Sequence, residues 1–339
     1  MTIRTTRCRR REVCSAARLP LLLSFAVVAC GGTLDAGWDQ PKGLLPVDDR
    51  NPIVICNDGH LDNWQGEYAM LLSNSSGLSL AGIVVSTGGV WQDLGENLAG
   101  WQQMVAAARQ GGLRNIPDPV TSESPPLVQP SDGNIDSTEP NNSEGARFIV
   151  DTSRQLALPL RPLAVVTGGK LTDVADAYLM DHTLSDRVVV VSSLGSVKSD
   201  GGEMGVPNGE MDTWADIIVA QKLRYVQVSA FYEQSADMPS SLLEKLPANA
   251  FTAWIESKQP EVWSDVLVAA DQVGVLAVAI PEFVSAVTRV VQEGVSSDGF
   301  PLLPSDPSGQ VQLVTEVDGA VATTRFQEML MDSAASDPE

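Results

Sequence analysis

The chain has 339 residues, enough for one large α/β domain or two small ones with an ample apolar core. It carries 43 acidic residues against 22 basic ones, for a formal net charge of −21. Such a surface repels nucleic acid and anionic lipid headgroups. The composition therefore excludes a nucleic-acid partner and favours a neutral or cationic small ligand.

The first thirty residues have the layout of an export signal. Six arginines between Arg4 and Arg18 precede an apolar segment, Leu19 to Ala29, that is too short to span a bilayer. The segment ends in Val27-Val28-Ala29-Cys30-Gly31-Gly32, which resembles a bacterial lipoprotein signal with cleavage before Cys30 and lipid on its thiol. An ordinary secretory signal cut nearby is the alternative. We expect an extracytoplasmic lipoprotein that lies at the outer membrane or faces the periplasm.

Removal of residues 1–29 leaves 16 basic and 42 acidic residues, for a formal charge of −26. Residues 30–50 are then expected to form a flexible tether, so that the lipid is the protein's only attachment to the membrane. Cys8 and Cys14 leave with the signal, and Cys56 remains as the one cysteine of the domain. A disulfide framework and a thiolate metal cluster are both excluded.

Five apolar runs rich in Val and Ile alternate with helical segments in the first two thirds of the domain. The predicted strands are residues 53–56, 80–86, 163–167, 188–192 and 225–229, and the predicted helices are roughly 64–73, 94–110, 145–156, 171–180 and 211–221. This alternation predicts an open, mostly parallel, doubly wound (Rossmann-like) α/β sheet. Gly-x-Gly-x-x-Gly and Walker patterns are absent, which weakens any nucleotide-cofactor hypothesis.

The remaining segments lack that alternation. Residues 114–144 are rich in Pro, Ser, Asn and Asp, and we expect a mobile lid or a disordered insertion there. Trp254, Trp263 and residues 266–290 indicate helices in the C-terminal half. Residues 310–321 predict an antiparallel hairpin that turns around Val317-Asp318-Gly319-Ala320. All of these segments fall in one predicted domain, residues 51–330.

Polar residues gather where the predicted strands end. The first strand runs into Asn57-Asp58-Gly59-His60-Leu61-Asp62-Asn63, and Gly-rich turns with hydroxyl groups follow residues 86, 166 and 192. Ligands of open α/β sheets bind at this edge. Oxygen-bearing side chains at this spacing suit a hard cation, an activated water or sugar hydroxyls. The alternative is an acidic turn in which Asp62 or Asn63 caps the next helix.

Five segments in one order carry a resemblance to a known family. Cys56 to Asn63 stands where that family has Asp-Thr-Asp-Pro-Gly-x-Asp-Asp, and Leu80 to Gly89 looks like its second strand and loop. Thr167 to Asp173 is close to Thr-Gly-Pro-Leu-Thr-Asn, Pro207 to Asp212 resembles Pro-x-x-Glu-Phe-Asn, and Ala270-Asp271 replaces His-Asp. Together they resemble the inosine–uridine preferring nucleoside hydrolases over residues 52–325. A distant branch of this fold, with carbohydrate-related roles, opens with a similar loop.

The resemblance implies hydrolysis of the N-glycosidic bond of purine or pyrimidine ribonucleosides with a bound Ca²⁺. In this family pattern Asp58 would bind the ion and act as general base on a water, and Asp62 would bind a ribose hydroxyl. Glu210 and Asp212 would hold the other end of the sugar. Asn63, Asp271 and the carbonyl of Thr167 would complete the metal ligands.

Three departures from the pattern count against an ordinary enzyme. Asn63 replaces a carboxylate ligand, Cys56 replaces an acidic residue that orients ligands, and Ala270 replaces a histidine that protonates the leaving base. A hydrolase is the preferred hypothesis. A catalytically inactive lipoprotein that binds ribose or a nucleoside is the second hypothesis, and an acidic surface protein without a small ligand is the third. Base preference and homo-oligomer formation stay open.

Overall fold

A computed structural model describes the fold of residues 40–59, 65–75, 77–193, 207–228, 238–239, 248–258, 266–267, 271–295 and 303–334. The predicted signal segment and Cys30 lie outside these described residues. So do Asp62 and Asn63 of the predicted site, and Ala270, which departs from the family pattern. None of the described helices is long and apolar enough to cross a membrane.

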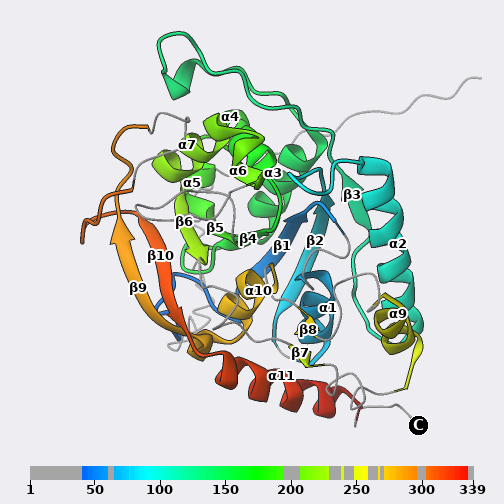
Figure 1. Cartoon of the computed structure of the whole chain (residues 1–339). Coiled ribbons are helices and arrows are strands. Elements are labelled where there is room, and N and C mark those ends of the chain that lie inside the picture. The colour runs from blue at the N-terminus through cyan, green and yellow to red at the C-terminus, as the bar shows by residue number, and fades with distance from the viewer. Residues whose placement is uncertain are drawn as a thin grey trace, which may run out of the picture. The chain divides into compact units, whose positions relative to one another are not determined.

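The domain is built on an eight-stranded sheet with the order β3-β2-β1-β4-β5-β6-β10-β9 (Figure 1). Every neighbouring pair is parallel except β10 and β9, which are antiparallel. The strands are β1 (Pro52–Asn57), β2 (Ser79–Val85), β3 (Pro119–Thr121), β4 (Leu163–Thr167), β5 (Val188–Ser192), β6 (Arg224–Val228), β9 (Val284–Val290) and β10 (Val311–Val317). A separate antiparallel pair joins β7 (Met238–Pro239) and β8 (Val266–Leu267). The predicted open, mostly parallel sheet is confirmed.

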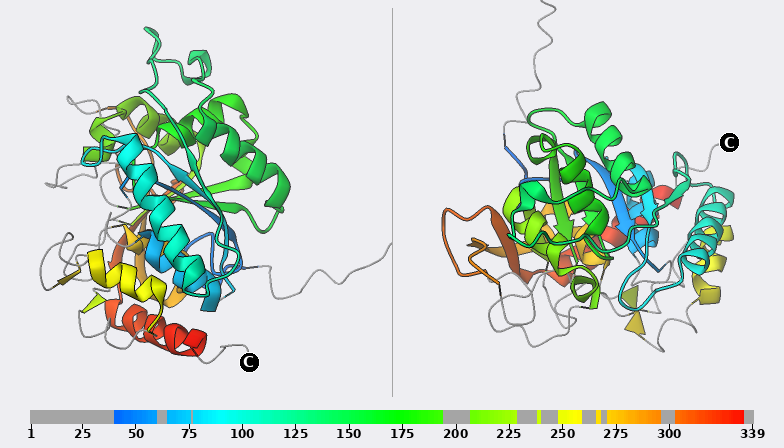
Figure 2. Two further views of the ribbon diagram at one scale, coloured as in Figure 1. Left: turned by 90° about the vertical axis from the view of Figure 1, so that its right-hand side faces the viewer. Right: turned by 90° about the horizontal axis from the view of Figure 1, so that it is seen from above.

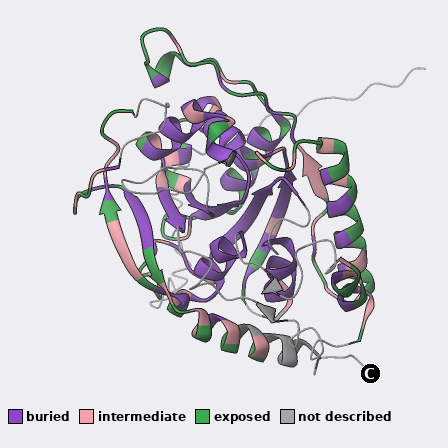
Figure 3. Ribbon diagram, viewed as in Figure 1, coloured by how far each residue is buried: buried purple, intermediate pink, exposed green. Residues whose placement is uncertain are grey.

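Helices cover both faces of the sheet, so the central strands are buried along their length (Figures 2 and 3). Successive residues of β1 therefore enter different cores: Ile53 and Ile55 pack into one apolar cluster, and Val54 and Cys56 into the other. This double burial explains why the strands have continuous Val and Ile runs rather than alternating ones.

One face is covered by α1 (Gln65–Ser75), α2 (Leu94–Gln110), α9 (Ala250–Lys258), α10 (Gln272–Ala279) and α11 (Gly319–Ala334). The other is covered by α3 (Glu144–Leu156), α4 (Thr172–Met180), α5 (Leu184–Arg187) and α7 (Thr213–Lys222). Short helices complete the chain: η1 (Ile135–Ser137), α6 (Pro207–Glu210) and η3 (Pro281–Phe283).

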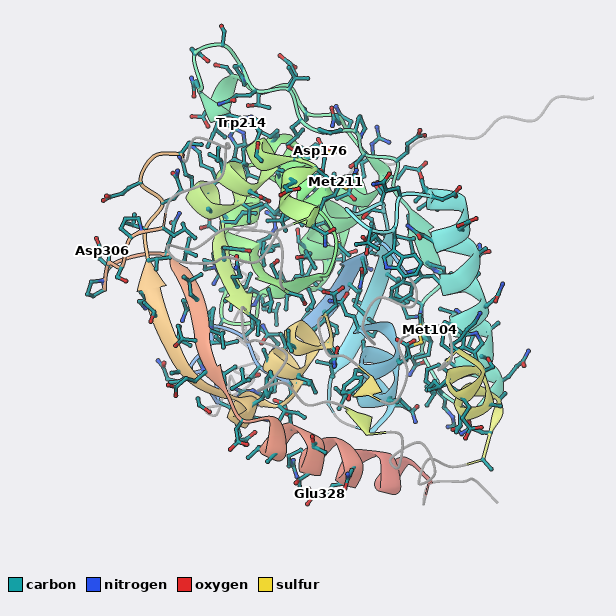
Figure 4. The ribbon with its side chains drawn as sticks, viewed as in Figure 1. Met104, Asp176, Met211, Trp214, Asp306 and Glu328 are labelled. Carbon is teal, nitrogen blue, oxygen red and sulfur yellow. The ribbon has the colours of Figure 1, made fainter. Side chains whose placement is uncertain are left out.

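The segment between α2 and α3 is fixed to the domain, unlike the lid or disordered insertion that its composition predicts. Its strand β3 pairs with β2 at the edge of the sheet. Asp176 of α4, labelled in Figure 4, accepts hydrogen bonds from the amides of Asn142 and Ser143 at 3.1 and 2.7 Å. The indole of Trp214 on α7 donates to the hydroxyl of Thr138 at 3.0 Å. The segment has no periodic apolar residues, and hydrogen bonds to side chains of α4 and α7 help to hold it on the domain.

The C-terminal predictions are wrong in two places. Residues 284–290 form strand β9 rather than a helix, and residues 311–317 pair with both β6 and β9 in the main sheet. The expected hairpin turn at Asp318-Gly319 is instead the start of α11, where the Asp318 side chain accepts from the amide of Val321 at 3.0 Å. Asp-Gly serves equally as a tight turn and as a helix start, so the local sequence does not separate the two.

Residues 40–51, which the sequence assigns to the tether, pack on the domain. Leu45 and Val47 are buried in the first apolar cluster. The Asp48 side chain accepts from the amides of Lys42 and Arg50, both at 3.0 Å. The part of the predicted tether that lies outside the described residues therefore ends at residue 39.

Candidate functional site

The candidate site lies at the edge of the sheet where the parallel strands end. The loops after β1, β2, β4 and β5 meet there, together with Asp271, the residue before α10. Backbone hydrogen bonds tie these loops in sequence: the amide of Ser86 donates to Asn57, that of Gly168 to Cys56 and that of Ser193 to Thr167, at 2.9, 3.0 and 2.9 Å. We call this edge the catalytic rim, after the function that we propose for it.

Asp58 follows β1 and is almost fully buried, with 1% of its surface exposed. Its Oδ1 accepts from the amide of Gly59 at 2.8 Å, and its carbonyl accepts from the indole of Trp101 at 3.1 Å. Its Oδ2 lies against Gly88 so closely that a Cβ at residue 88 would overlap it. The carboxylate is therefore held in one position by the glycine of the neighbouring loop.

Asp271 comes from far along the sequence and meets the turn that follows β4. A Cβ at Gly168 would lie 2.6 Å from Oδ2 of Asp271 and 2.6 Å from Nδ2 of Asn57. At Gly169 a Cβ would lie 3.4 Å from the amide nitrogen of Asp58. Because both residues are glycines, the carboxylate of Asp271 and the backbone of Asp58 can approach the same turn.

Two neutral side chains anchor the loop of Asp271. The hydroxyl of Ser193 donates to its carbonyl at 2.8 Å, and Nε2 of Gln65 donates to the same carbonyl at 3.3 Å. The Oε1 of Gln65 accepts from Nδ2 of Asn57 at 2.8 Å. The amides of Asn57 and Gln65 thus link the end of β1 to the start of α10, and the hydroxyl of Ser193 links the end of β5 to it.

Asn208, which the sequence analysis did not assign to the site, bridges two loops of the catalytic rim. Its Nδ2 donates to the carbonyl of Gly168 at 2.6 Å, and its Oδ1 accepts from the amide of Gly89 at 2.8 Å. The only signal in the sequence is its place in the segment 207–212, which was singled out for Glu210 and Asp212. Asn208 fixes the glycine turns against which both carboxylates rest.

The two acidic residues of that segment have different surroundings. Glu210 is exposed at the end of α6. Asp212 is buried and caps α7: its Oδ1 accepts from the amide of Ala215 at 3.0 Å. Its Oδ2 accepts from the amide of Leu127 at 2.9 Å and from the hydroxyl of Thr172 at 2.8 Å. Burial raises the pKa of Asp212, whereas these hydrogen bonds lower it.

Lys170 brings a positive charge into this acidic region. It is 5% exposed and donates to the carbonyl of Ser124. Burial lowers the pKa of Lys170, while the charges of Asp173, Asp212 and Asp58 act to raise it. Burial also raises the pKa of Asp173, although the hydroxyls of Ser122 and Ser143 donate to it at 2.6 and 2.8 Å. Nothing in the sequence marks Lys170 as a buried charge, because it follows two glycines in a turn where an exposed lysine is common.

The oxygen donors of the catalytic rim suit a hard cation. Asp58 and Asp271 supply carboxylates, and the buried Oγ1 of Thr167 has no hydrogen-bond partner among the residues that the structure describes. Buried carboxylates are costly without compensating positive charge, and oxygen donors of this kind fit Ca²⁺. Within the described ranges no group of three or more His, Cys, Asp and Glu side chains is placed to hold a metal. The predicted ligand Asn63 lies outside those ranges.

Solved structures identify the fold. A plant nucleoside hydrolase is 16% identical with a TM-score of 0.59, over 83% of this chain and 99% of the other. An inosine-guanosine nucleoside hydrolase is 18% identical with a TM-score of 0.60, over 82% and 99%. A purine-preferring ribonucleoside hydrolase from Gardnerella vaginalis is 17% identical with a TM-score of 0.58, over 83% and 99%.

The chain therefore has the nucleoside hydrolase fold, and at these identities the likeness extends to the fold alone. No protein-family model matches the sequence, and no curated protein matches it either.

Proposed function

We propose that this protein hydrolyses the N-glycosidic bond of ribonucleosides. The observation that carries the proposal is the convergence of buried Asp58 and Asp271 on the Gly168-Gly169 turn at the catalytic rim of a nucleoside hydrolase fold. A sugar cation forms as the base departs, so the reaction needs fixed negative charge beneath the ribose and a water held at the anomeric carbon. Buried carboxylates in a rigid frame supply the charge.

Asp58 is the proposed general base. Its Oδ1 accepts from the amide of Gly59 and its Oδ2 lies against Gly88, so the carboxylate has a defined position between the loops after β1 and β2. Asn208 and Trp101 hold this arrangement from two sides, through Gly89 and through the carbonyl of Asp58. Roles of Asp62, Glu210 and Asp212 in binding the ribose stay predictions from the family resemblance.

Ca²⁺ is the proposed cofactor, held by Asp58, Asp271, Asn63 and the carbonyl of Thr167. When bound, it would bind the water and the ribose hydroxyls and compensate the buried carboxylates. The carbonyl of Thr167 already accepts from the amide of Ser193, so one of its two lone pairs remains for a further partner.

The carboxylate of Asp212 already accepts three hydrogen bonds from Leu127, Thr172 and Ala215, so its predicted contact with the sugar would add little to binding in either function. A second function, binding without catalysis, is favoured by Ala270, which stands where the family pattern has the histidine that protonates the leaving base. A protein of this kind would bind a nucleoside or ribose without cleaving it.

The test is release of free ribose from a panel of purine and pyrimidine nucleosides by residues 31–339, with Ca²⁺ and with a chelator. We expect release that stops when the ion is removed. Thermal unfolding with nucleoside or ribose runs beside it, because a ligand that binds only the native state raises the melting temperature. Stabilisation without release would establish the binding function. Neither stabilisation nor release would contradict both.

We also propose that the protein is exported and anchored through a lipid on Cys30. The basic and apolar segments before Cys30 and the glycines after it support this proposal. Residues 30–39 would connect the lipid to the domain. Recovery of the chain in the membrane fraction, and its loss from that fraction in Cys30→Ala, would test the anchor.

A further inference from the structure

An exposed apolar turn precedes β4 on the side of the sheet opposite the catalytic rim. Seven large apolar side chains are exposed among the described residues, and three of them lie in residues 156–160. Leu158 and Leu160 are 55% and 57% exposed. The backbones of Leu158 and Arg161 pair through two hydrogen bonds of 2.9 Å, which hold both leucines at the tip of a tight turn. We call residues 156–160 the apolar turn.

The apolar turn lies beside the place where the chain enters the domain. Nδ2 of Asn51 donates to the carbonyl of Pro162 at 2.7 Å, which joins the entry segment to the residue after the turn. Arg50 donates to the carbonyl of Gln40 at 3.0 Å, so the first described residue is held at the same edge. Leu44, a fourth exposed apolar residue, belongs to this entry segment.

The length of chain before Gln40 limits how far this edge can lie from a lipid on Cys30. Nine residues lie between Cys30 and Gln40, so ten Cα-to-Cα steps join the two. Fully extended, they span at most about 35 Å, which is less than the thickness of a bilayer with its headgroups. Because residues 40–51 pack on the domain, they add no further reach. The entry segment of an anchored domain is therefore held within about 35 Å of the lipid surface, which brings the apolar turn within reach of it.

The charge of this edge differs from that of the whole protein. The segments 40–51, 151–162 and 181–187 contain five basic and five acidic residues, against 16 and 42 in residues 30–339. Many of these charges are paired: Asp181 forms ion pairs of 2.8 Å with both Arg154 and Arg187. Repulsion from anionic headgroups is therefore expected to be weaker over these segments than over the rest of the surface.

We propose that the apolar turn docks into the interfacial region of the lipid bilayer beside the Cys30 anchor. The inference rests on the anchor proposed above. When the leucines of the apolar turn enter the boundary between headgroups and acyl chains, their apolar surface leaves the water. Such a small patch binds a membrane weakly by itself, but the lipid on Cys30 keeps it near the membrane and so raises its effective concentration there. The catalytic rim lies at the other end of the strands, so Asp58 and Asp271 face away from the membrane toward their substrate.

The experiment places a polarity-sensitive thiol label on the full lipidated protein in vesicles of phosphatidylethanolamine and phosphatidylglycerol. The labelled variants are Leu160→Cys and, as the matched control, Val128→Cys, at an apolar position 79% exposed on the segment between α2 and α3. Cys56 is buried and Cys30 carries the lipid, so the introduced thiol reacts selectively. We expect iodide in the water to quench the label at residue 160 at least about threefold less than the label at residue 128.

Flotation of the vesicles separates failure of the anchor from failure of docking. A protein that does not float with the vesicles contradicts the anchor, and the docking that depends on it. A protein that floats but shows equal iodide quenching at both positions contradicts docking alone. Protection of residue 160 that persists in residues 31–339 without lipid, vesicles or detergent would show that protein covers the turn and would also overturn the proposal. Because the readout is independent of turnover, loss of nucleosidase activity does not affect it.

Discussion

The carboxylate of Asp58 occupies the space in which a side chain at Gly88 would begin. The proposed general base and the loop after β2 are therefore packed without a gap, and residue 88 must be glycine for Asp58 to keep its position. The same principle recurs at Gly168, against which Asp271 and Asn57 lie. Each carboxylate therefore packs against the backbone of a glycine, Gly88 for Asp58 and Gly168 for Asp271.

Gly88→Ala is expected to displace Asp58 and to lower ribose release by about a hundredfold or more, because small displacements of a reacting group are costly. Gly77→Ala is the matched control, since its Cβ would meet only the carbonyl of Asp49 at 3.9 Å. Initial rates of the two variants measure the difference. Equal rates would show that the position of Asp58 does not matter for turnover.

Asn208→Ala is expected to lower the free energy of unfolding by about 1–3 kcal/mol, because it leaves the amide of Gly89 and the carbonyl of Gly168 without their partner. Asn141→Ala removes an exposed amide that donates to the carbonyl of Pro125, and should cost less than about 0.5 kcal/mol. Urea unfolding of both variants is the measurement. A cost for Asn208→Ala as small as that of the control would contradict the bridging role.

Glu67 in the first turn of α1 makes stability depend on pH. Burial raises the pKa of Glu67 from its ordinary 4.5 to about 8, and within the described part of the chain its Oε2 has no hydrogen-bond partner. Below pH 4.5 both the folded and the unfolded state hold the proton. Between pH 4.5 and 8 only the folded state does, so stability falls as pH rises, by up to about 1.4 kcal/mol per pH unit. Above pH 8 the penalty is constant.

Glu67→Gln removes this titration. The melting temperature of the variant should change less between pH 5 and pH 8 than that of the unaltered protein. Glu96→Gln, an exposed glutamate in the first turn of α2, serves as the control and should follow the unaltered protein. Parallel melting curves for all three proteins would show that Glu67 is ionised in the folded state.

The sheet could be predicted from the sequence because its signals are local. The bounds predicted for β4, β5 and α2 match the structure, since Val runs mark the strands, and Asp93 caps α2 by accepting from the amide of Glu96. Strand β9 was missed because it lies at the sheet edge with its residues partly exposed, so it lacks the buried run of the central strands. Strand β3 has three residues, too few for any period.

The candidate site could be predicted only in part. Asp58, Thr167 and Asp271 stand directly after strands or before a helix, and the fold brings them to the same edge. Gln65, Lys170 and Asn208 contribute through long-range contacts that no local pattern encodes. For Lys170, only the folded chain reveals that a buried ammonium lies among carboxylates from three segments.

Lys170→Met is expected to destabilise the protein by about 3–5 kcal/mol at neutral pH, because the buried carboxylates then lose their compensating charge. The loss should shrink as pH falls, since burial raises the pKa values of Asp173 and Asp212 and protonation removes their charge. Lys42→Met removes an exposed partner of Asp49 and should cost less than about 1 kcal/mol. Denaturant unfolding at neutral and acidic pH checks both. A loss that does not change with pH would contradict the electrostatic explanation.

The central claim is that Asp58 and the catalytic rim hydrolyse a ribonucleoside. The most direct measurement is the initial rate of ribose release with Ca²⁺ by the unaltered protein, by Asp58→Asn and by Asp136→Asn, an exposed aspartate of η1. We predict release by the unaltered protein and by Asp136→Asn, and a loss of about a hundredfold or more in Asp58→Asn. Equal rates for all three, or no release above that of a chelated sample, would contradict the claim.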